Sequence, residues 1–369
     1  MNIKHLEAHA FRNHAHVSFD FAPHINLISG PNGVGKTNLI DSMHYLCMSR
    51  SFVSGSNVYV VKQGESGFSI KGEFEGRIRK SFEVGCTYDR GEGKKITVNQ
   101  SPLDRLSDLI GMVPVVVLSP DDKKLTAEGP VERRSFLDSF ISQLSKSYLR
   151  DLIDYRKIIR QRNRLLSTHG LNKSNLIAYI DPWNEQLIEV GSRIVAKRYA
   201  VTKEYSEFLE DGYQLISGMN HHPHFVYKSF CEPSTDTEQI AACFKERLMS
   251  VFDRELEREQ TLIGPHRDDL VFYLDDQEIR KYGSQGQHRM FALALKLAQL
   301  KYFTEKLDDL PLFLLDDVFG DLDPHKTEVF LKMLVEHKGQ TFITAANAEP
   351  LKKWIPLESD NNMQLEIKQ

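Results

Sequence analysis

The run of residues best suited to chemistry contains three glycines followed by a lysine and a threonine. It reads Gly30-Pro31-Asn32-Gly33-Val34-Gly35-Lys36-Thr37 and fits the spacing G-x-x-x-x-G-K-[ST] at every fixed position. Glycines let successive backbone N–H groups face one point, and these amides, with the positive end of a following helix, bind phosphate. Lys36 is predicted to reach the β- and γ-phosphates of a nucleotide, and the Thr37 hydroxyl to ligate Mg²⁺. We therefore expect this run, together with Asn38, to bind ATP.

Two adjacent carboxylates follow an apolar run late in the chain. The run is Leu312-Phe313-Leu314-Leu315-Asp316-Asp317, a pattern typical of a buried strand that ends in acids. Because side chains alternate along a strand, one acid is expected to face a metal ion and the other the attacking water. Asp316 is predicted to hold Mg²⁺ through water, and Asp317 to orient or deprotonate the water. Taken alone, the two acids could also form a solvated turn. With the phosphate-binding run, they make Lys36, Asp316 and Asp317 the predicted catalytic group.

A second glycine-bearing helix start lies between these two motifs. Tyr282-Gly283-Ser284-Gln285-Gly286-Gln287 precedes a segment whose apolar residues recur at helical spacing. Such a start leaves several backbone donors free and can bind a second anion. We predict nucleotide contacts from Ser284, Gly286 and Gln287; an ordinary polar helix cap is the alternative.

The elements that position these motifs indicate an α/β fold. Apolar and polar residues alternate over 3–11 and 16–21, which is the period of half-buried strands. Residues 25–28 form a third strand that ends in the glycine-rich turn, and residues 38–46 form the helix after it. Further strands are expected at 68–98, 112–118, 269–274, 312–315 and 341–344.

Long helical patterns dominate between residues 135 and 261. They cover 136–166, 187–209 and 237–256. We interpret 135–261 as a helical lobe inserted into a nucleotide-binding lobe, which is formed by 1–134 and 262–369. The sequence contains no internal repeat and no heptad array long enough for an extended coiled coil.

The composition excludes several classes of protein. With 369 residues, of which 41% are hydrophobic, the chain can bury a sizeable core. The 47 basic and 51 acidic side chains give a net charge of -4, which argues against a polycation that coats nucleic acid, so any DNA must be bound locally. The four cysteines form no C-x-x-C pair, and their sparseness fits a reducing cytosol. Residues 1–20 are polar and rich in histidine, so we expect no signal-peptide core there, and no apolar run approaches the roughly 18 residues that span a bilayer. We expect a soluble, cytoplasmic protein without a membrane partner.

The order of the motifs resembles that of the ABC-type ATPases. Ser-x-Gly-Gln before a helix, then two aspartates after a strand, then Gly320-Asp321-Leu322-Asp323 match the signature helix, Walker B strand and D-loop. In that superfamily the signature of one protomer covers the γ-phosphate held by the phosphate loop of another. The resemblance therefore implies an ATP-dependent homodimer.

Further segments resemble the RecF family of bacterial recombination mediators over nearly the whole length. They are 11–13, 117–122, 129–138, 160–163 and 264–270. The family belongs with the structural-maintenance-of-chromosomes (SMC) ATPases but lacks their long coiled-coil arm. The resemblance implies an SMC-like ATPase head that binds double-stranded and gapped DNA in replication, repair and the SOS response. It also implies work with RecO and RecR in loading RecA onto single-stranded DNA coated by single-strand-binding protein, with weak, DNA-dependent ATP hydrolysis.

Several residues depart from the wider ABC pattern. Asp317 stands where most ABC ATPases have the longer glutamate, so turnover is expected to be slow. Strand 342–346 carries no switch histidine, and Asn347 is the candidate substitute. Asp121 lies where a Q-loop glutamine is expected and is assigned a γ-phosphate-sensing role. Gln285 replaces a glycine of the signature.

Basic residues gather on the predicted helix 150–164. Six of them (150, 156, 157, 160, 162 and 164) stand against two acids (151 and 154), which gives a charge of +4. Arg156, Arg160 and Arg164 recur every four residues and would form one stripe. The stripe could follow a DNA backbone, but a solvated face or a face of the dimer fits equally well, and Arg133 and Arg134 have the same ambiguity. Segment 264–269 also remains open, because its residues permit a structural turn.

Two other classes share part of this pattern. The nucleotide-binding subunit of a transporter should carry a clear Q-loop and a switch histidine, and both are missing. A structural chromosome protein should have hundreds of heptad residues between its nucleotide motifs, and these are missing too.

Overall fold

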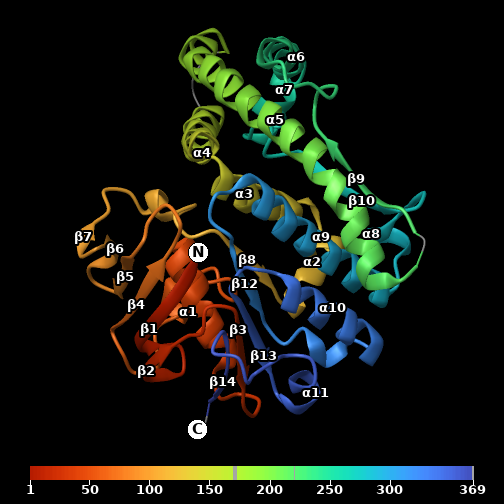
Figure 1. Cartoon of the computed structure of the whole chain (residues 1–369). Helices are drawn as coiled ribbons and strands as arrows, with labels where there is room; N and C mark the ends of the chain where they lie inside the picture. Colours follow the sequence, from red (N-terminus) through yellow and green to blue (C-terminus); the bar gives the residue numbers. More distant parts are fainter. Residues whose placement is uncertain (169–172, 220, 368–369) are drawn as a thin grey trace. The chain divides into compact units, whose positions relative to one another are not determined.

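A computed structural model of the chain describes residues 1–168, 173–219 and 221–367 (Figure 1). The chain divides into two compact units. The first comprises Met1–Lys123, Asp211–Asn220 and Arg289–Gln369, and the second comprises Lys124–Glu210 and His221–His288.

A parallel sheet of five strands forms the centre of the first unit, in the order β14-β3-β13-β12-β8. Its strands are β3 (Ile25–Ser29), β8 (Val115–Leu118), β12 (Leu312–Leu315), β13 (Thr341–Ala345) and β14 (Asn362–Glu366). Every residue of β3, β12 and β13 is buried, which explains their continuous apolar runs. Because all the pairings are parallel, the carboxyl ends of these three strands meet at one edge of the sheet.

A second, antiparallel sheet in this unit has the order β2-β1-β4-β5-β6-β7. Its strands are β1 (Asn2–Phe11), β2 (His14–Asp20), β4 (Gly67–Glu75), β5 (Phe82–Asp89), β6 (Gly93–Val98) and β7 (Ser101–Pro102). Helix α1 (Lys36–Met48) contacts β1, β4 and β5 of this sheet and β8 and β13 of the parallel one. Since α1 is covered from both sides, eleven of its thirteen residues are buried.

The remaining helices of the first unit belong to its C-terminal part. They are α9 (Gln285–Lys306), which begins in the second unit, α10 (Pro324–Glu336) and α11 (Glu349–Lys352). Short 3-10 turns lie at Asn57–Tyr59, Leu106–Leu109, Pro120–Lys123 and Phe319–Asp321. Helix α9 is buried on most sides from Met290 to Phe303, which accounts for its nearly continuous apolar sequence.

The second unit is mainly helical. Its helices are α2 (Lys124–Ala127), α3 (Pro130–Leu144), α4 (Lys146–Leu166), α5 (Lys173–Ser217, whose end lies in the first unit), α6 (Thr237–Ser250), α7 (Phe252–Arg258) and α8 (Ile279–Tyr282). A small antiparallel sheet, in the order β11-β10-β9, comprises β9 (Pro223–Lys228), β10 (Asp269–Leu274) and β11 (Gln277–Glu278).

The compact units and the lobes expected from the sequence have different bounds. Residues 262–288 lie in the second unit, because β10 pairs with β9 and packs on α3. Residues 124–134 lie there as well, since α2 packs on α3.

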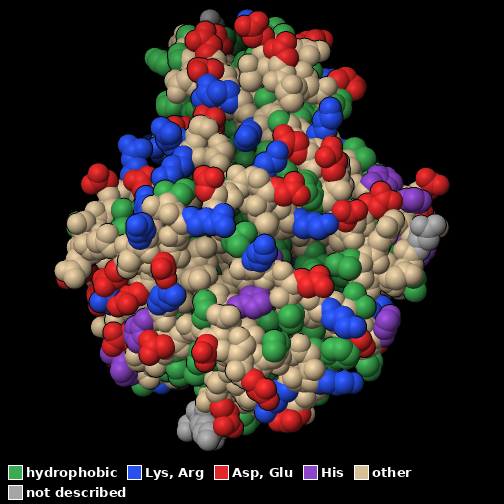
Figure 2. Space-filling view, in the orientation of Figure 1, with side chains coloured by type: hydrophobic (Ala, Val, Ile, Leu, Met, Phe, Trp, Pro, Cys, Tyr) green, Lys and Arg blue, Asp and Glu red, His purple; other side chains and the backbone are tan. Residues whose placement is uncertain are grey.

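The surface carries mixed charge. On the face that Figure 2 shows, Lys and Arg side chains are interspersed with Asp and Glu, in keeping with the small net charge. Among the helices of the described residues, none combines the length and hydropathy that crossing a bilayer requires.

Candidate active site

The glycine-rich run forms the turn between β3 and α1, as the sequence predicts. Gly35, with a φ of 108°, immediately precedes the helix. A Cβ at this position would lie 2.5 Å from the His14 ring and 2.6 Å from the Asn13 side chain, so the turn requires glycine. Within the described part of the chain, no side chain caps this helix start. The first N–H groups of α1 therefore form the kind of helix end that binds anions.

Lys36 and Thr37 begin α1 and have different partners. The Lys36 ammonium donates to the carbonyl oxygens of Gly30, at 2.7 Å, and Pro31, at 2.9 Å. Thr37 Oγ1 donates to Asp316 Oδ1 at 2.9 Å. The lysine charge thus lies inside the glycine turn, and the hydroxyl joins the turn to the acidic end of β12. Among the other predicted loop residues, Pro31, Asn32 and Gly33 are exposed, and Val34 is buried.

Residues between β1 and β2 support the phosphate loop from the side. The Asn13 amide donates to the Gly33 carbonyl at 3.4 Å and accepts from the Asn38 amide at 2.6 Å. His14 Nε2 lies 3.0 Å from the Gly35 carbonyl oxygen, and burial lowers the pKa of this histidine. The neutral ring can still donate its one N–H to that carbonyl. Segment 11–13 contributed to the family resemblance, but no local sequence pattern links Asn13 or His14 to the phosphate loop.

Arg12 ties the same turn to α1. Its Nε donates to Asp41 Oδ2 at 2.7 Å, and its Nη2 donates to Ser51 Oγ at 2.7 Å. Ser51 Oγ in turn donates to Asp41 Oδ2 at 2.8 Å. Because Asp41 is fully buried, this closed network fixes the β1–β2 turn against the helix that carries Lys36 and Thr37.

Asp316 joins three segments at the edge of the parallel sheet. Its Oδ1 accepts hydrogen bonds from Thr37 and from Thr344 of β13, both at 2.9 Å. Thr344 Oγ1 also accepts from the Asp317 N–H at 2.9 Å. Burial raises the pKa of the Asp316 carboxyl, while the two hydroxyl donors oppose that shift. The sequence did not indicate a role for Thr344, because a switch histidine was the only functional residue expected in strand 342–346.

Asp317 differs from its neighbour in exposure and backbone conformation. Its side chain is exposed, and its φ of 48° lies in the left-handed region, which is rare for residues other than glycine. Arg289 of α9 donates to the carbonyl oxygen of the next residue, Val318, at 2.8 Å. Burial lowers the pKa of Arg289, and the Asp317 carboxylate acts in the opposite direction. The turn that presents Asp317 is thus held by Thr344 on one side and Arg289 on the other.

The residues of this site fit ATP and Mg²⁺. The Thr37 hydroxyl and the Asp316 carboxylate are hard oxygen ligands that already share a hydrogen bond, and Mg²⁺ prefers such ligands. The glycine turn, the start of α1 and the Lys36 ammonium provide the donors and charge that phosphates require. The structure thus joins Thr37, which follows Lys36, to Asp316, which precedes Asp317 and lies 279 residues away in the sequence.

The second predicted anion site begins α9, within the second unit. The Ser284 N–H donates to Gln287 Oε1 at 2.8 Å, and the Gln287 N–H donates to Ser284 Oγ at 3.3 Å. These reciprocal bonds form a capping box, which satisfies two donors of the helix start. Ser284 and Gly286 are exposed. The capping role is therefore established, and contact with a nucleotide stays a prediction.

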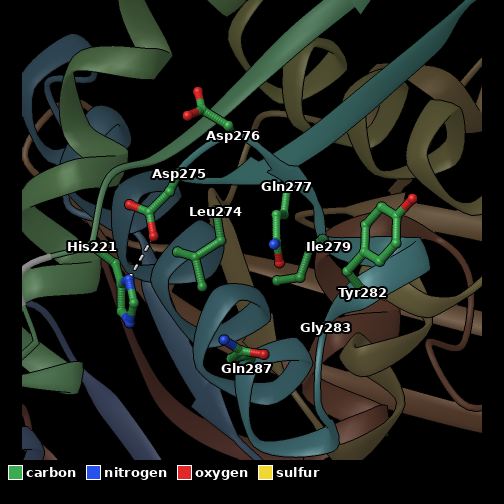
Figure 3. Close-up of a pocket in the computed structure, with 9 residues that line it drawn as sticks. All are labelled: His221, Leu274, Asp275, Asp276, Gln277, Ile279, Tyr282, Gly283 and Gln287. Carbon is green, nitrogen blue, oxygen red and sulfur yellow. Dashed lines mark hydrogen bonds and ion pairs between the residues drawn. The ribbon is translucent and has the colours of Figure 1, made fainter.

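A pocket of about 280 Å³ lies beside this helix start (Figure 3). Gln287 of α9 and Tyr282 of α8 are on its wall, and the Tyr282 residue is 69% exposed. His221 Nδ1 pairs with Asp275 Oδ2 at 2.7 Å on another part of the wall. The capping glutamine can therefore be reached by a ligand or a protein that enters the pocket.

The two predicted sensor residues lie in loops of the first unit. Asp121 is exposed in the turn after β8, and its neighbour Asp122 pairs with Lys296 at 2.9 Å. Asn347 follows β13, and its Oδ1 accepts from the N–H of Glu349, the first residue of α11, at 3.0 Å. Sensing of a γ-phosphate by Asp121 or Asn347 stays a prediction.

Segment 264–269 belongs to a buried polar network of the second unit. Arg198 donates to the Pro265 carbonyl oxygen and to Asp138 Oδ1, both at 2.7 Å. The Tyr227 hydroxyl donates to Asp268, whose pKa burial raises to about 6. This arrangement is the structural turn that the sequence analysis kept as an alternative.

Two basic residues considered for DNA binding are instead buried in ion pairs. Arg133 donates to both oxygens of Asp269, at 2.7 and 2.8 Å, and is 3% exposed. Arg162 is fully buried and donates to Glu255 Oε2 at 2.6 Å and Thr261 Oγ1 at 2.8 Å. Neither can contact a DNA backbone. The exposed basic residues of α4 are Lys146, Arg150, Arg156, Lys157, Arg160 and Arg164.

Comparison with known proteins places these features in a family. The family model described as the RecF/RecN/SMC N-terminal domain matches residues 2–364. The DNA replication and repair protein RecF of Salinibacter ruber is 41% identical over 371 residues, which cover 98% of this chain and 89% of the relative. RecF of Chloroherpeton thalassium is 38% identical over 350 residues, which cover 93% and 94% of the two chains.

Solved structures agree with this result. The structure of the recombination mediator protein RecF-ATP in the RecFOR pathway has a TM-score of 0.87 and 30% identity, and the match covers 94% of each chain. The SMC head domain of Pyrococcus furiosus, at 13% identity and a TM-score of 0.56 over 95% and 91% of the two chains, shares the fold. The predicted ABC-type ATPase head is thereby confirmed. With the motif order, nearly full-length relatives and shared fold in agreement, the chain belongs to the RecF family of the RecF/RecN/SMC group.

Proposed function

We propose that the chain is an ATP-driven switch that dimerises on DNA during replication and repair. The observation that carries this proposal is the junction of Thr37, Asp316 and Thr344, which joins the phosphate loop to the Walker B strand. The ATP in the matched RecF structure supports the choice of nucleotide. In this proposal, residues 1–134 and 262–369 form the nucleotide-binding lobe and residues 135–261 the inserted helical lobe.

Within one copy, each side chain of the site has a distinct task. The amides of the glycine turn and the Lys36 ammonium bind the phosphates. Thr37 and Asp316 hold Mg²⁺, which offsets charge on the phosphates when it is bound. Asp317 orients or deprotonates the attacking water. Because aspartate is shorter than glutamate, this contact is less favourable and hydrolysis is slow.

A second copy completes the site in this scheme. Ser284, Gly286 and Gln287 of that copy contact the nucleotide held by Lys36 of the first. If only the dimer makes these contacts, ATP binding and dimerisation must strengthen each other by the same factor. Hydrolysis then releases the dimer.

DNA and the recombination proteins are the proposed partners. Double-stranded and gapped DNA would contact the exposed basic residues of α4, and DNA that favours the dimer would tighten ATP binding. Together with RecO and RecR, the chain would help RecA to replace single-strand-binding protein, including in the SOS response. The description of its relatives as DNA replication and repair proteins supports this role. The proposed loading of RecA can be tested by measuring how fast RecA replaces single-strand-binding protein on DNA, with the chain added or withheld.

Sedimentation of the full chain tests the switch itself. With ATP and Mg²⁺ the wild type should sediment as a dimer, and gapped DNA should shift the transition to lower ATP concentration. Lys36→Met should remain monomeric, because it lacks the charge that the loop presents to phosphate. A wild type that stays monomeric with ATP, and binds DNA equally well without it, would contradict the proposal.

Replacing Arg156, Arg160 and Arg164 of α4 by alanine should weaken DNA binding and its dependence on salt. If each arginine neutralises one phosphate, the log–log salt slope should fall by about 2.7. Lys301, Lys332 and Lys352 lie outside α4, and replacing them by alanine removes the same charge, so that variant is the matched control. Equal salt slopes for the two variants would place DNA elsewhere.

Thr344→Val should reduce kcat for ATP hydrolysis about tenfold and leave ATP binding nearly unchanged. The hydroxyl positions Asp316 and the Asp317 backbone, so its loss disturbs the acids more than the phosphate loop. Thr341→Val, in the same buried strand, is the control. A loss confined to ATP affinity would show that Thr344 does not position the acids.

A further inference from the structure

Three side chains converge on the β1–β2 hairpin of the first unit. His9 and His16 are directly opposite each other, and Glu7 lies two residues from His9 on the same face of β1. Glu7 Oε1 is 3.0 Å from His9 Nε2 and 3.1 Å from His16 Nε2. One candidate ligand atom from each residue lies within 4.8 Å of the other two. The imidazole rings are stacked, with centroids 4.2 Å apart and planes at 12°, so both rings present their edges to the same carboxylate.

We propose that Glu7, His9 and His16 form a binding site for one divalent transition-metal ion, with Zn²⁺ as its representative. Two imidazoles and one carboxylate are a ligand set that such ions accept, with water in the remaining position. Tetrahedral Zn²⁺, with bonds of about 2.0 Å, places its ligand atoms about 3.3 Å apart. The distances from Glu7 to the two histidines are already close to this value, and the stacked rings must turn toward each other so that both Nε2 atoms face one ion.

The hairpin prepares the site in two ways. First, paired strands fix the Cα positions of all three residues, which reduces the entropy lost on binding. Second, the side chains of Glu7, His9 and His16 are 37%, 50% and 54% exposed, so an ion can enter from solvent. Binding requires neutral imidazoles, and the ion would displace any proton shared with the carboxylate.

The surroundings of the site leave room for the remaining ligand. A hollow of about 370 Å³ opens beside Glu7 and His9 on the exposed face of the antiparallel sheet. The nearest cation across the sheet is Lys71, which is opposite Glu7 on β4. Its ammonium pairs with Glu83 at 2.6 Å, so its repulsion of a metal ion is partly offset.

Metal binding at this place would clamp the hairpin whose turn supports the phosphate loop. The ion would join β1 to β2, and Asn13 of the turn and His14 at the start of β2 contact Gly33 and Gly35. The proposal goes beyond the ATP switch, since it concerns a second inorganic ligand, bound by β1 and β2 close to their turn and not by the phosphate loop. It can be tested without nucleotide.

The test is competition for ZnCl₂ between the full chain and a chromophoric chelator in nucleotide-free buffer. Wild type should bind one more Zn²⁺ than His16→Asn, and Glu7→Gln should weaken that site at least tenfold. His5→Asn is the matched control, because His5 pairs with Asp20 on the same hairpin but lacks a second histidine. It should bind as wild type does.

A melting experiment adds an independent readout. Zn²⁺ should raise the melting temperature of wild type and His5→Asn, but not of His16→Asn, while all three should melt alike in EDTA. If His16→Asn melts lower in EDTA, Glu7→Gln takes its place in the comparison. Equal zinc stoichiometry and affinity in wild type, His16→Asn and Glu7→Gln would overturn the proposal, whatever the outcome for ATP.

Discussion

Asp317→Asn should lower the rate of ATP hydrolysis by roughly a hundredfold or more and leave the ATP-induced dimer in place. The side chain is exposed at the end of β12, where it can orient or deprotonate water, and loss of such a base typically costs at least that factor. Among the described residues, the Asp317 side chain has no hydrogen bond or ion pair with the phosphate loop, whereas Asp316 bonds to Thr37. Binding and hydrolysis should therefore separate.

Single-turnover release of phosphate and sedimentation with ATP measure the two properties. Asp308→Asn is the matched control, since it removes an exposed carboxylate shortly before the same strand and should have no effect on either. Asp316→Asn should differ from Asp317→Asn, because it alters the residue bonded to Thr37 and is expected to weaken Mg²⁺-dependent binding. If Asp317→Asn hydrolyses ATP at the wild-type rate, the water is handled by another group.

Arg162→Met should destabilise the second unit by about 3–5 kcal/mol, the cost of leaving a buried charge without its partner. Arg162 and Glu255 are both fully buried, and their nearest atoms are 2.6 Å apart. The same guanidinium bonds to Asn184 at 2.8 Å and Thr261 at 2.8 Å, so two further segments lose a contact. Urea unfolding followed by circular dichroism measures the change.

Two further variants separate the effect of the unpaired buried charge on stability from the effect of removing an arginine. Arg164→Met removes an exposed arginine from the same helix and should change stability by less than about 0.5 kcal/mol. The double variant Arg162→Met/Glu255→Met should be more stable than Arg162→Met alone, because no unpaired charge then stays buried. Similar losses in Arg162→Met and Arg164→Met would refute this account.

The motifs with local spacing were predictable, and the side chains that join them were not. The spacing of the glycines and the strand that precedes them predicted the phosphate loop, and an apolar run that ends in two acids predicted β12. Thr344 and Asn13 contact these motifs from distant segments, and nothing in their own neighbourhood indicates it. Strands β9 and β14 were missed because they are short and partly exposed, and three of the five residues of β14 are polar.

Counting the basic residues of α4 does not reveal which of them are exposed to solvent. Arg156, Arg160 and Arg164 are exposed, in agreement with their spacing of four residues. Arg162 is two residues from Arg160, about 200° around the helix, and so faces the interior. Its partner Glu255 is 93 residues away, which explains why the sequence analysis counted it with the exposed arginines.

The strand order of the parallel sheet bears on how the polypeptide matures on the ribosome. Strand β3 lies between β13 and β14, which are synthesised more than 300 residues later. Since domains generally acquire structure as they emerge, the glycine turn leaves the exit tunnel long before either neighbour of β3 exists. A nascent polypeptide that ends before β13 therefore lacks both neighbours of β3 and also Thr344, and we expect it to bind the nucleotide more weakly than a chain that contains them.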